Sequence, residues 1–117
     1  MAKIDQYRKD LQEILSEYGT YLNQARGIVE NEEFEIQTIF DTVRDHYQLV
    51  HVGFANRQRQ YGCLFHADIK NEKIWIQHNS TDLAIGDDLL ARGVPKSDIV
   101  LGFYSPEMRR FSEYAIN

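Results

Sequence analysis

The sequence predicts an α+β fold: a long N-terminal helix packed on a meandering antiparallel sheet of about four strands, followed by one or two short C-terminal helices. Two observations predict it. Apolar side chains recur at steps of three and four over about residues 3–25, which is typical of a helix buried along one side. Over residues 34–78 apolar and polar side chains alternate in short stretches, which is typical of strands. The length suits one domain, 1–117.

The N-terminal helix carries an apolar stripe made of Ile4, Tyr7, Leu11, Ile14, Leu15, Tyr18, Tyr21, Leu22 and Ala25. Charged residues such as Glu13 and Glu17 fall on or near the other side. We expect the stripe to pack on the protein's own sheet, because amphipathic helices mainly bury their apolar side in a core. A second interpretation stays open: the part around Tyr18 and Tyr21 contacts another subunit, since tyrosine has an apolar body and a polar tip.

Alternating stretches predict strands at about 34–40, 46–54, 61–69 and 73–78. The polar segment 56–60 predicts a connecting loop. Because the connections between neighbouring strands are short, an antiparallel meander is favoured.

The last two predicted strands are joined by a tight turn at Asn71 and Glu72. Asparagine tolerates the left-handed backbone of such turns, but glutamate is less suited than glycine. With two central residues, the turn pairs Ile69 with Ile74, Ala67 with Ile76, and Phe65 with His78. These pairs make the apolar face that the helix covers. Strand parity sends Trp75, Gln77, His66 and Asp68 to the opposite face.

Beyond the sheet, residues 80–82 (Ser-Thr-Asp) offer caps for a helix over about 82–92, and Gly93 stands where that helix should end. Pro95 then begins a short helical turn over residues 96–100, and Pro106 begins a last turn or short helix towards Tyr114.

Composition indicates a globular protein of the cytoplasm with no membrane span. The single cysteine, Cys63, cannot form an intramolecular disulfide, and the start of the chain has no signal-like pattern. No apolar run approaches the roughly 20 residues that cross a bilayer.

The net charge of −5 is confined to residues 1–45, which hold ten acids and five bases. The rest of the chain is neutral. DNA-binding domains usually need a basic face, so tight nucleic-acid binding is disfavoured and a basic partner protein is favoured. The candidate nucleic-acid contacts are two short basic pairs, Arg57 with Arg59 and Arg109 with Arg110.

The histidines predict neither a catalytic site nor a cofactor or metal site. His66 and Asp68 share a strand face by parity, whereas His78 should lie on the other face. Their spacing matches no zinc signature. Asp45 and His46 are adjacent on a strand and therefore point to opposite faces.

Other reactive residue types have simple structural interpretations. Asp87 and Asp88 fit a solvated face of the second helix, and Cys63 fits a small buried hydrophobe. The sequence contains no glycine-flanked serine elbow and no glycine-rich phosphate loop. We therefore expect no catalytic residues.

The only tryptophan, Trp75, is expected on the face away from the N-terminal helix. The simpler interpretation is that the second helix covers it, because most large aromatic side chains are largely buried. The functional interpretation is a partner interface anchored by Trp75, with Gln77 and Tyr61 beside it.

Several longer phrases resemble a known family. They are residues 40–48 (FDTVRDHYQ), 74–78 (IWIQH), 87–89 (DDL) and 93–103 (GVPKSDIVLGF). In this order they resemble the XisI family, the excision controlling factors of the fdxN element, found mainly in cyanobacteria. The resemblance implies a role in programmed excision of a DNA element during heterocyst differentiation, with the recombinase being another protein. It also implies a companion, XisH, which has a nuclease-like fold, and it supplies no catalytic residues.

Three functions compete at this stage. The first is a non-catalytic regulatory module that binds an XisH-like protein. The second is an accessory DNA-binding factor that uses the four arginines. The third is a small hydrolase built around His66, Asp68 and His78, which requires these side chains to converge. A homodimer formed through an exposed sheet edge or the Trp75 face is a further alternative.

Overall fold

A computed structural model describes residues 2–30 and 32–117 and confirms the predicted α+β fold. Its elements are α1 (Ala2–Arg26), β1 (Glu33–Asp41), β2 (His46–Ala55), β3 (Gln58–Lys70), β4 (Lys73–Asn79), α2 (Ile85–Ala91), the 3₁₀ turn η1 (Lys96–Asp98), β5 (Ile99–Leu101) and α3 (Pro106–Arg109). None of the helices in the described part is long and apolar enough to cross a membrane.

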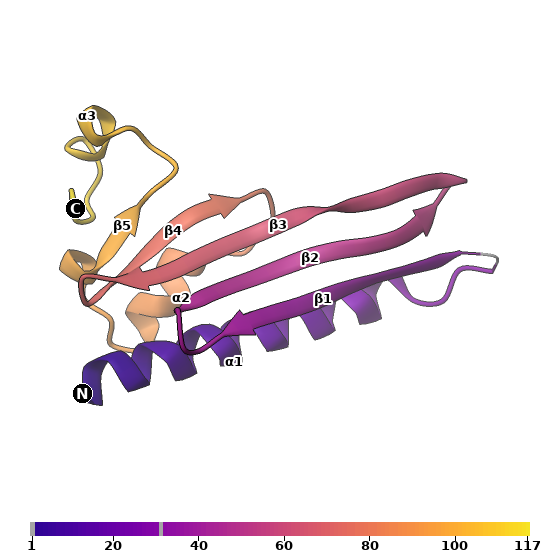
Figure 1. The fold of residues 1–117 in the computed structure, drawn as a ribbon, viewed down its shortest axis with the longest axis horizontal. Coiled ribbons are helices and arrows are strands. Elements are labelled where there is room, and N and C mark those ends of the chain that lie inside the picture. Colours follow the sequence, from indigo (N-terminus) through magenta and orange to yellow (C-terminus); the bar gives the residue numbers. More distant parts are fainter. Residues whose placement is uncertain (1, 31) are drawn as a thin grey trace.

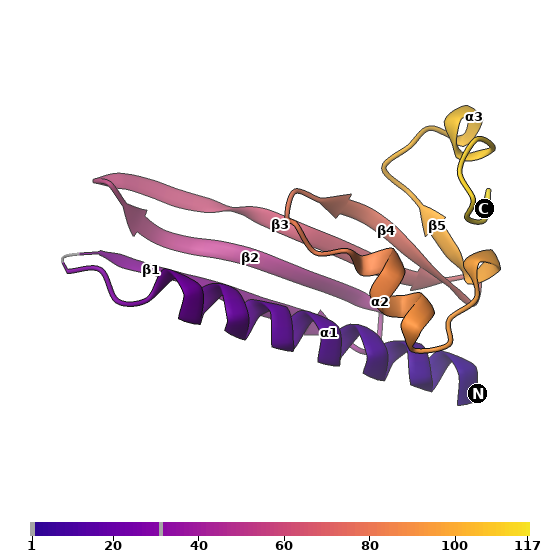
Figure 2. The same ribbon diagram turned by 180° about the vertical axis from the view of Figure 1, so that it is seen from behind.

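The strands form one open sheet in the order β1-β2-β3-β4-β5 (Figure 1). The first four strands pair antiparallel, as predicted. The fifth strand was not predicted: it pairs parallel with β4 and has only three residues, too few for an alternating pattern. Helices α1 and α2 lie beside each other on one face of the sheet (Figure 2). We call this the helix face, and the other the open face.

The core lies between the helix face and α1. The prediction that the apolar stripe packs on the protein's own sheet is confirmed for its first half, where Leu11 and Leu15 are fully buried. From the sheet and α2 the core receives Tyr47, Leu49, Phe65, Ala67, Ile69, Ile74, Ile76, Ile85 and Leu89. Each large side chain buried in this way contributes about 1.5–3 kcal/mol.

Two tight turns close the long hairpins, at Asn56-Arg57 and Asn71-Glu72. All four residues have positive φ, the conformation of a type I′ turn. The predicted two-residue turn between β3 and β4 is confirmed. The predicted loop over 56–60 is wrong, because β3 already begins at Gln58. The two-residue turn was missed because it has arginine in its second position, where glycine would have indicated a hairpin.

Two bulges change the alternation of the sheet. Between β2 and β3, Leu49 pairs with Phe65 but Val50 pairs with Cys63, so Leu64 is the extra residue. A bulge turns the following side chains to the other face. Cys63 consequently lies on the open face and is exposed. The prediction that Cys63 is a buried hydrophobe is therefore wrong.

The second bulge lies between β3 and β4. Ile69 pairs with Ile74 and Ala67 with Ile76, as predicted, but Phe65 pairs with Asn79 instead of His78. The extra residue is Gln77, and His78 becomes the partner of His66. Directly paired residues share a sheet face, so the prediction that His78 lies on the helix face is wrong.

The segment after the sheet differs from prediction at the start of the second helix and in the turn after Pro95, which ends at Asp98 because Ile99 and Val100 belong to β5. Helix α2 begins at Ile85, and no side chain caps it. Thr81 instead joins a turn with Asn79, whose side-chain oxygen accepts hydrogen bonds from the Thr81 amide and hydroxyl. Gly93 follows α2 with φ of 92°, and η1 follows Pro95, both as predicted.

Buried polar contacts hold the N-terminal end of α1. The Arg8 guanidinium donates to both carboxylate oxygens of Asp45, at 2.8 and 3.1 Å, and the Tyr47 hydroxyl donates to the same carboxylate at 2.8 Å. Further along α1, Asp10 is only 1% exposed and faces Arg92 at 3.4 Å. These contacts fix α1 against both the sheet and α2.

We predict that Glu72→Gly stabilises the protein by about 0.5–1 kcal/mol, because Glu72 holds φ of 62° and glycine adopts this conformation without steric cost. Urea unfolding measures the change. Glu35→Gly is the control: it removes a glutamate from strand β1, where glycine should lower stability. Equal effects of both substitutions would contradict the turn geometry.

We predict that Asp45→Asn flattens the acid dependence of stability. Hydrogen bonding from Arg8 outweighs burial and lowers the pKa of Asp45 below its ordinary 3.8. The ionised Asp45 carboxylate therefore stabilises the fold fully at pH values above its ordinary pKa of 3.8. This contribution is lost as the pH falls through the lowered pKa of the folded protein. Asparagine tolerates the φ of 64° at this position.

The difference in unfolding free energy between Asp45→Asn and the wild type should be constant above about pH 5 and should shrink as the pH falls from there to about pH 2. Asp5→Asn is the matched control, because Asp5 also pairs with Arg8 but is exposed, and exposed ion pairs contribute little. A constant difference between wild type and Asp45→Asn across this range would rule out the ionised pair as the cause.

Candidate interaction surface

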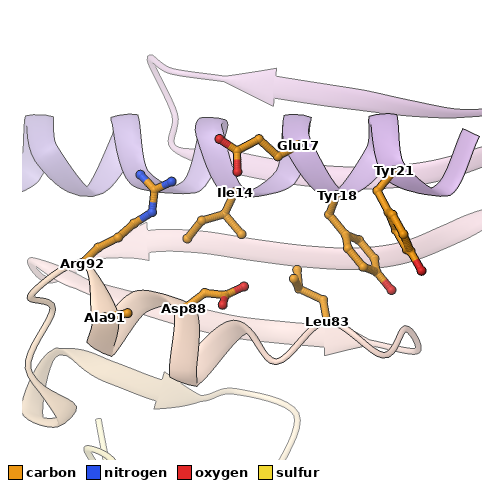
Figure 3. A pocket seen from close by; sticks show the side chains of 8 residues that line it. All are labelled: Ile14, Glu17, Tyr18, Tyr21, Leu83, Asp88, Ala91 and Arg92. Carbon is orange, nitrogen blue, oxygen red and sulfur yellow. The ribbon is translucent and has the colours of Figure 1, made fainter. Parts of the chain in front are cut away.

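A groove of about 380 Å³ runs between α1 and α2 (Figure 3). It is lined by Ile14, Glu17, Tyr18, Tyr21, Leu83, Asp88, Ala91 and Arg92. The α1 members are spaced by three and four residues, so they lie on one side of that helix. We call this hollow the α1/α2 groove.

The wall formed by α1 is aromatic. The Tyr18 and Tyr21 rings stack with centroids 5.9 Å apart and an interplanar angle of 29°. Figure 3 shows both rings extending from α1 on the Leu83 side of the groove. Tyr21 is 61% exposed, so a flat ring face is available to a bound side chain.

The charges of the groove are unequal. Its lining contains two acids, Glu17 and Asp88, and one base, Arg92. The Arg92 guanidinium reaches toward α1 and donates to Glu13 at 2.7 Å and to Asp10 at 3.4 Å. The hydrogen bond from Arg92 lowers the pKa of Glu13 below its ordinary value. Since Arg92 is already balanced by carboxylates outside the lining, the groove is acidic.

The predicted interface residues do not form one surface. Tyr18 and Tyr21 line the α1/α2 groove, whereas Trp75, Gln77 and Tyr61 belong to strands β3 and β4. Trp75 is only 7% exposed, and Tyr61 is 74% exposed near the far end of the β2–β3 hairpin.

The predicted cover of Trp75 by the second helix is wrong, because α2 lies on the helix face. Arg109 of α3 instead lies over the Trp75 ring, 5.1 Å from its centroid, with the Lys70 ammonium at 4.1 Å. The Arg109 guanidinium also donates to the backbone carbonyls of Leu101 and Tyr104. Arg109 therefore packs the C-terminal segment onto the open face.

The four candidate nucleic-acid contacts lie at opposite ends of the molecule. Arg57 and Arg59 belong to the β2–β3 hairpin end, and Arg109 and Arg110 to α3 and its end (Figure 1). The longest dimension of the molecule is 46 Å. Arg59 lies over the Phe54 ring, with 5.3 Å to the centroid. The four arginines thus make no continuous basic face.

The open face brings together a histidine–aspartate cluster. His66 and Asp68 share this face, as predicted, and their side chains meet at 2.7 Å. His46, which the sequence interpretation did not connect with them, also contacts Asp68 at 2.7 Å. As predicted, Asp45 and His46 point to different faces.

Sequence reasoning missed the acidic side chains of the groove. Glu17 was placed on or near the polar side of α1, and Asp88 on a solvated face of the second helix. Both assignments describe each helix in isolation. The groove arises only when α2 packs beside α1, and a single sequence carries no signal for that contact.

Comparisons with known proteins agree with this fold. The family model described as XisI protein matches residues 1–116. A solved XisI-like protein from Anabaena variabilis ATCC 29413 is 35% identical, with a TM-score of 0.83 over 97% of this chain and 99% of that one.

A second solved structure, the fdxN element excision controlling factor XisI from the same organism, is also 35% identical. Its TM-score is 0.83 over 98% of this chain and 99% of that one. A search of curated proteins gave no match. With its family model matched over nearly all residues, the chain belongs to the XisI family.

Proposed function

We propose that this protein is a non-catalytic regulator that controls excision of an fdxN-type DNA element by binding an XisH-like protein. The proposed contact is supported by the α1/α2 groove, in which two acidic side chains lie beside an aromatic wall that includes the exposed Tyr21. The element is suggested by the solved relative, which is described as an fdxN element excision controlling factor.

The groove suits a basic side chain of the partner. A guanidinium can stack on the exposed ring of Tyr21 while it donates hydrogen bonds to Glu17 or Asp88. Arginine fits better than lysine, because its planar guanidinium can stack on an aromatic ring and can donate two parallel hydrogen bonds to one carboxylate. The acids of residues 1–45 add long-range attraction for a basic partner.

The groove is one anchor of a larger contact. A specific interface buries roughly 800 Å² on each partner and involves about 20–30 residues a side, whereas eight residues line the groove. We expect the exposed side of α1 next to the groove, with residues such as Thr20 and Gln24, to supply the rim.

This proposal includes no direct DNA contact and no catalysis. The net charge of −5 opposes approach to phosphates, and the four arginines lie at two ends of the molecule. The hydrolase alternative required His66, Asp68 and His78 to converge in a pocket. Asp68 instead joins His66 to His46 on the open face, and His46 is 52% exposed.

We predict that Glu17→Gln with Asp88→Asn weakens binding to an XisH-like protein by about tenfold or more. Close charge pairs at an interface can contribute about 1.5 kcal/mol or more, and about 1.4 kcal/mol corresponds to a tenfold change in affinity. Calorimetry of the purified pair measures the change. Tyr21→Ala should weaken binding to a similar degree.

Glu33→Gln with Glu35→Gln is the matched control, because it removes the same charge from exposed positions of β1. Affinity in this control should stay within about twofold at moderate salt. Absence of a wild-type complex at micromolar concentrations would refute the proposed partner. Equal losses in both double variants would refute the groove as the anchor.

A further inference from the structure

The open face of the sheet carries a cluster that the proposed regulatory contact does not use. His46 begins β2 and is the register partner of Asp68 in β3. His66 precedes Asp68 by two residues on the same strand, so all three side chains stand on one face. The α1/α2 groove lies on the opposite side of the sheet (Figure 2).

The two histidines converge on a single carboxylate oxygen. His46 Nδ1 and His66 Nε2 each lie 2.7 Å from Asp68 Oδ1, and the three ligand-type atoms all lie within 4.8 Å of one another. The two rings are almost perpendicular, at 87°, with centroids 6.2 Å apart. Their nitrogens thus approach one point from two directions.

The carboxylate is held in place from both sides. Its second oxygen, Oδ2, accepts a hydrogen bond from the Gln77 side chain at 3.2 Å. Gln77 stands two residues after Trp75 on β4, so it reaches the open face as strand parity predicts.

We propose that His46, His66 and Asp68 bind a divalent transition-metal ion, with zinc as the expected ion. Two imidazole nitrogens and one carboxylate oxygen are a ligand set of catalytic-type zinc sites, and nitrogen ligands exclude magnesium and calcium. Zinc ligands stand about 2.0–2.2 Å from the ion, so the nitrogens and oxygen must separate to roughly 3.3 Å. Rotation of the His46 and His66 rings, whose side chains are 52% and 30% exposed, provides this movement.

The fourth position of a tetrahedral ion faces away from the sheet. Water fills it in the isolated protein, and a side chain of another protein can replace that water. The ion also links β2 to β3 at the end of the sheet where β2 begins. Zinc should therefore raise the melting temperature, because it binds only the folded arrangement of the three ligands.

The experiment titrates metal-free protein with Zn²⁺ against a chromogenic chelator and records the thermal shift in parallel. We expect one ion per chain with micromolar or tighter affinity and a rise in melting temperature. His46→Gln and His66→Gln should each weaken binding by about tenfold or more, and Asp68→Asn likewise. Circular dichroism establishes that each variant is folded.

Two controls separate this site from incidental binding. His78→Gln removes an exposed histidine paired with His66 but outside the cluster, and Cys63→Ser removes the exposed thiol of the same face. Both should bind zinc within about twofold of wild type. The proposal is overturned if wild type binds no zinc at tens of micromolar, or if the His46→Gln/His66→Gln double variant binds as tightly as wild type.

Discussion

The apolar side of α1 must be covered, and the helix face of the sheet provides the apolar surface that covers it. Leu11 and Leu15 of α1 are fully buried against Tyr47, Leu49 and the strands beside them. This packing decides which face of each strand is apolar. Because α1 and α2 both pack on the helix face, the open face can carry His46, Asp68 and further polar side chains at little cost to the core.

The same packing creates the α1/α2 groove. Helix α2 buries Ile85 and Leu89 in the common core and thereby lies beside α1. Arg92, just beyond α2, then meets the buried Asp10. Since Arg92 is occupied there, the acids further along the groove remain available to a partner. The groove and the histidine–aspartate cluster lie on opposite sides of the sheet, so mutations can test them separately.

Periodic features of this fold were predictable, and local departures from period were not. The apolar stripe predicted α1, and asparagine in a two-residue gap predicted the turn before Lys73. The bulges at Leu64 and Gln77 carry no sequence signal, and each one reverses a parity argument. That is why the predicted position of Cys63 was wrong. His46 was missed for a different reason: its contact with Asp68 depends on the register between two strands.

Backbone amide mapping by NMR of the complex with the XisH-like protein tests the central claim most directly. The claim is that the α1/α2 groove is the surface through which this XisI-family protein acts. We predict shift changes concentrated at residues 14–24 of α1 and 83–92 around α2, with the β2–β3 hairpin near Tyr61 unchanged. Changes confined to the open face or to that hairpin, with the groove unaffected, would contradict the account.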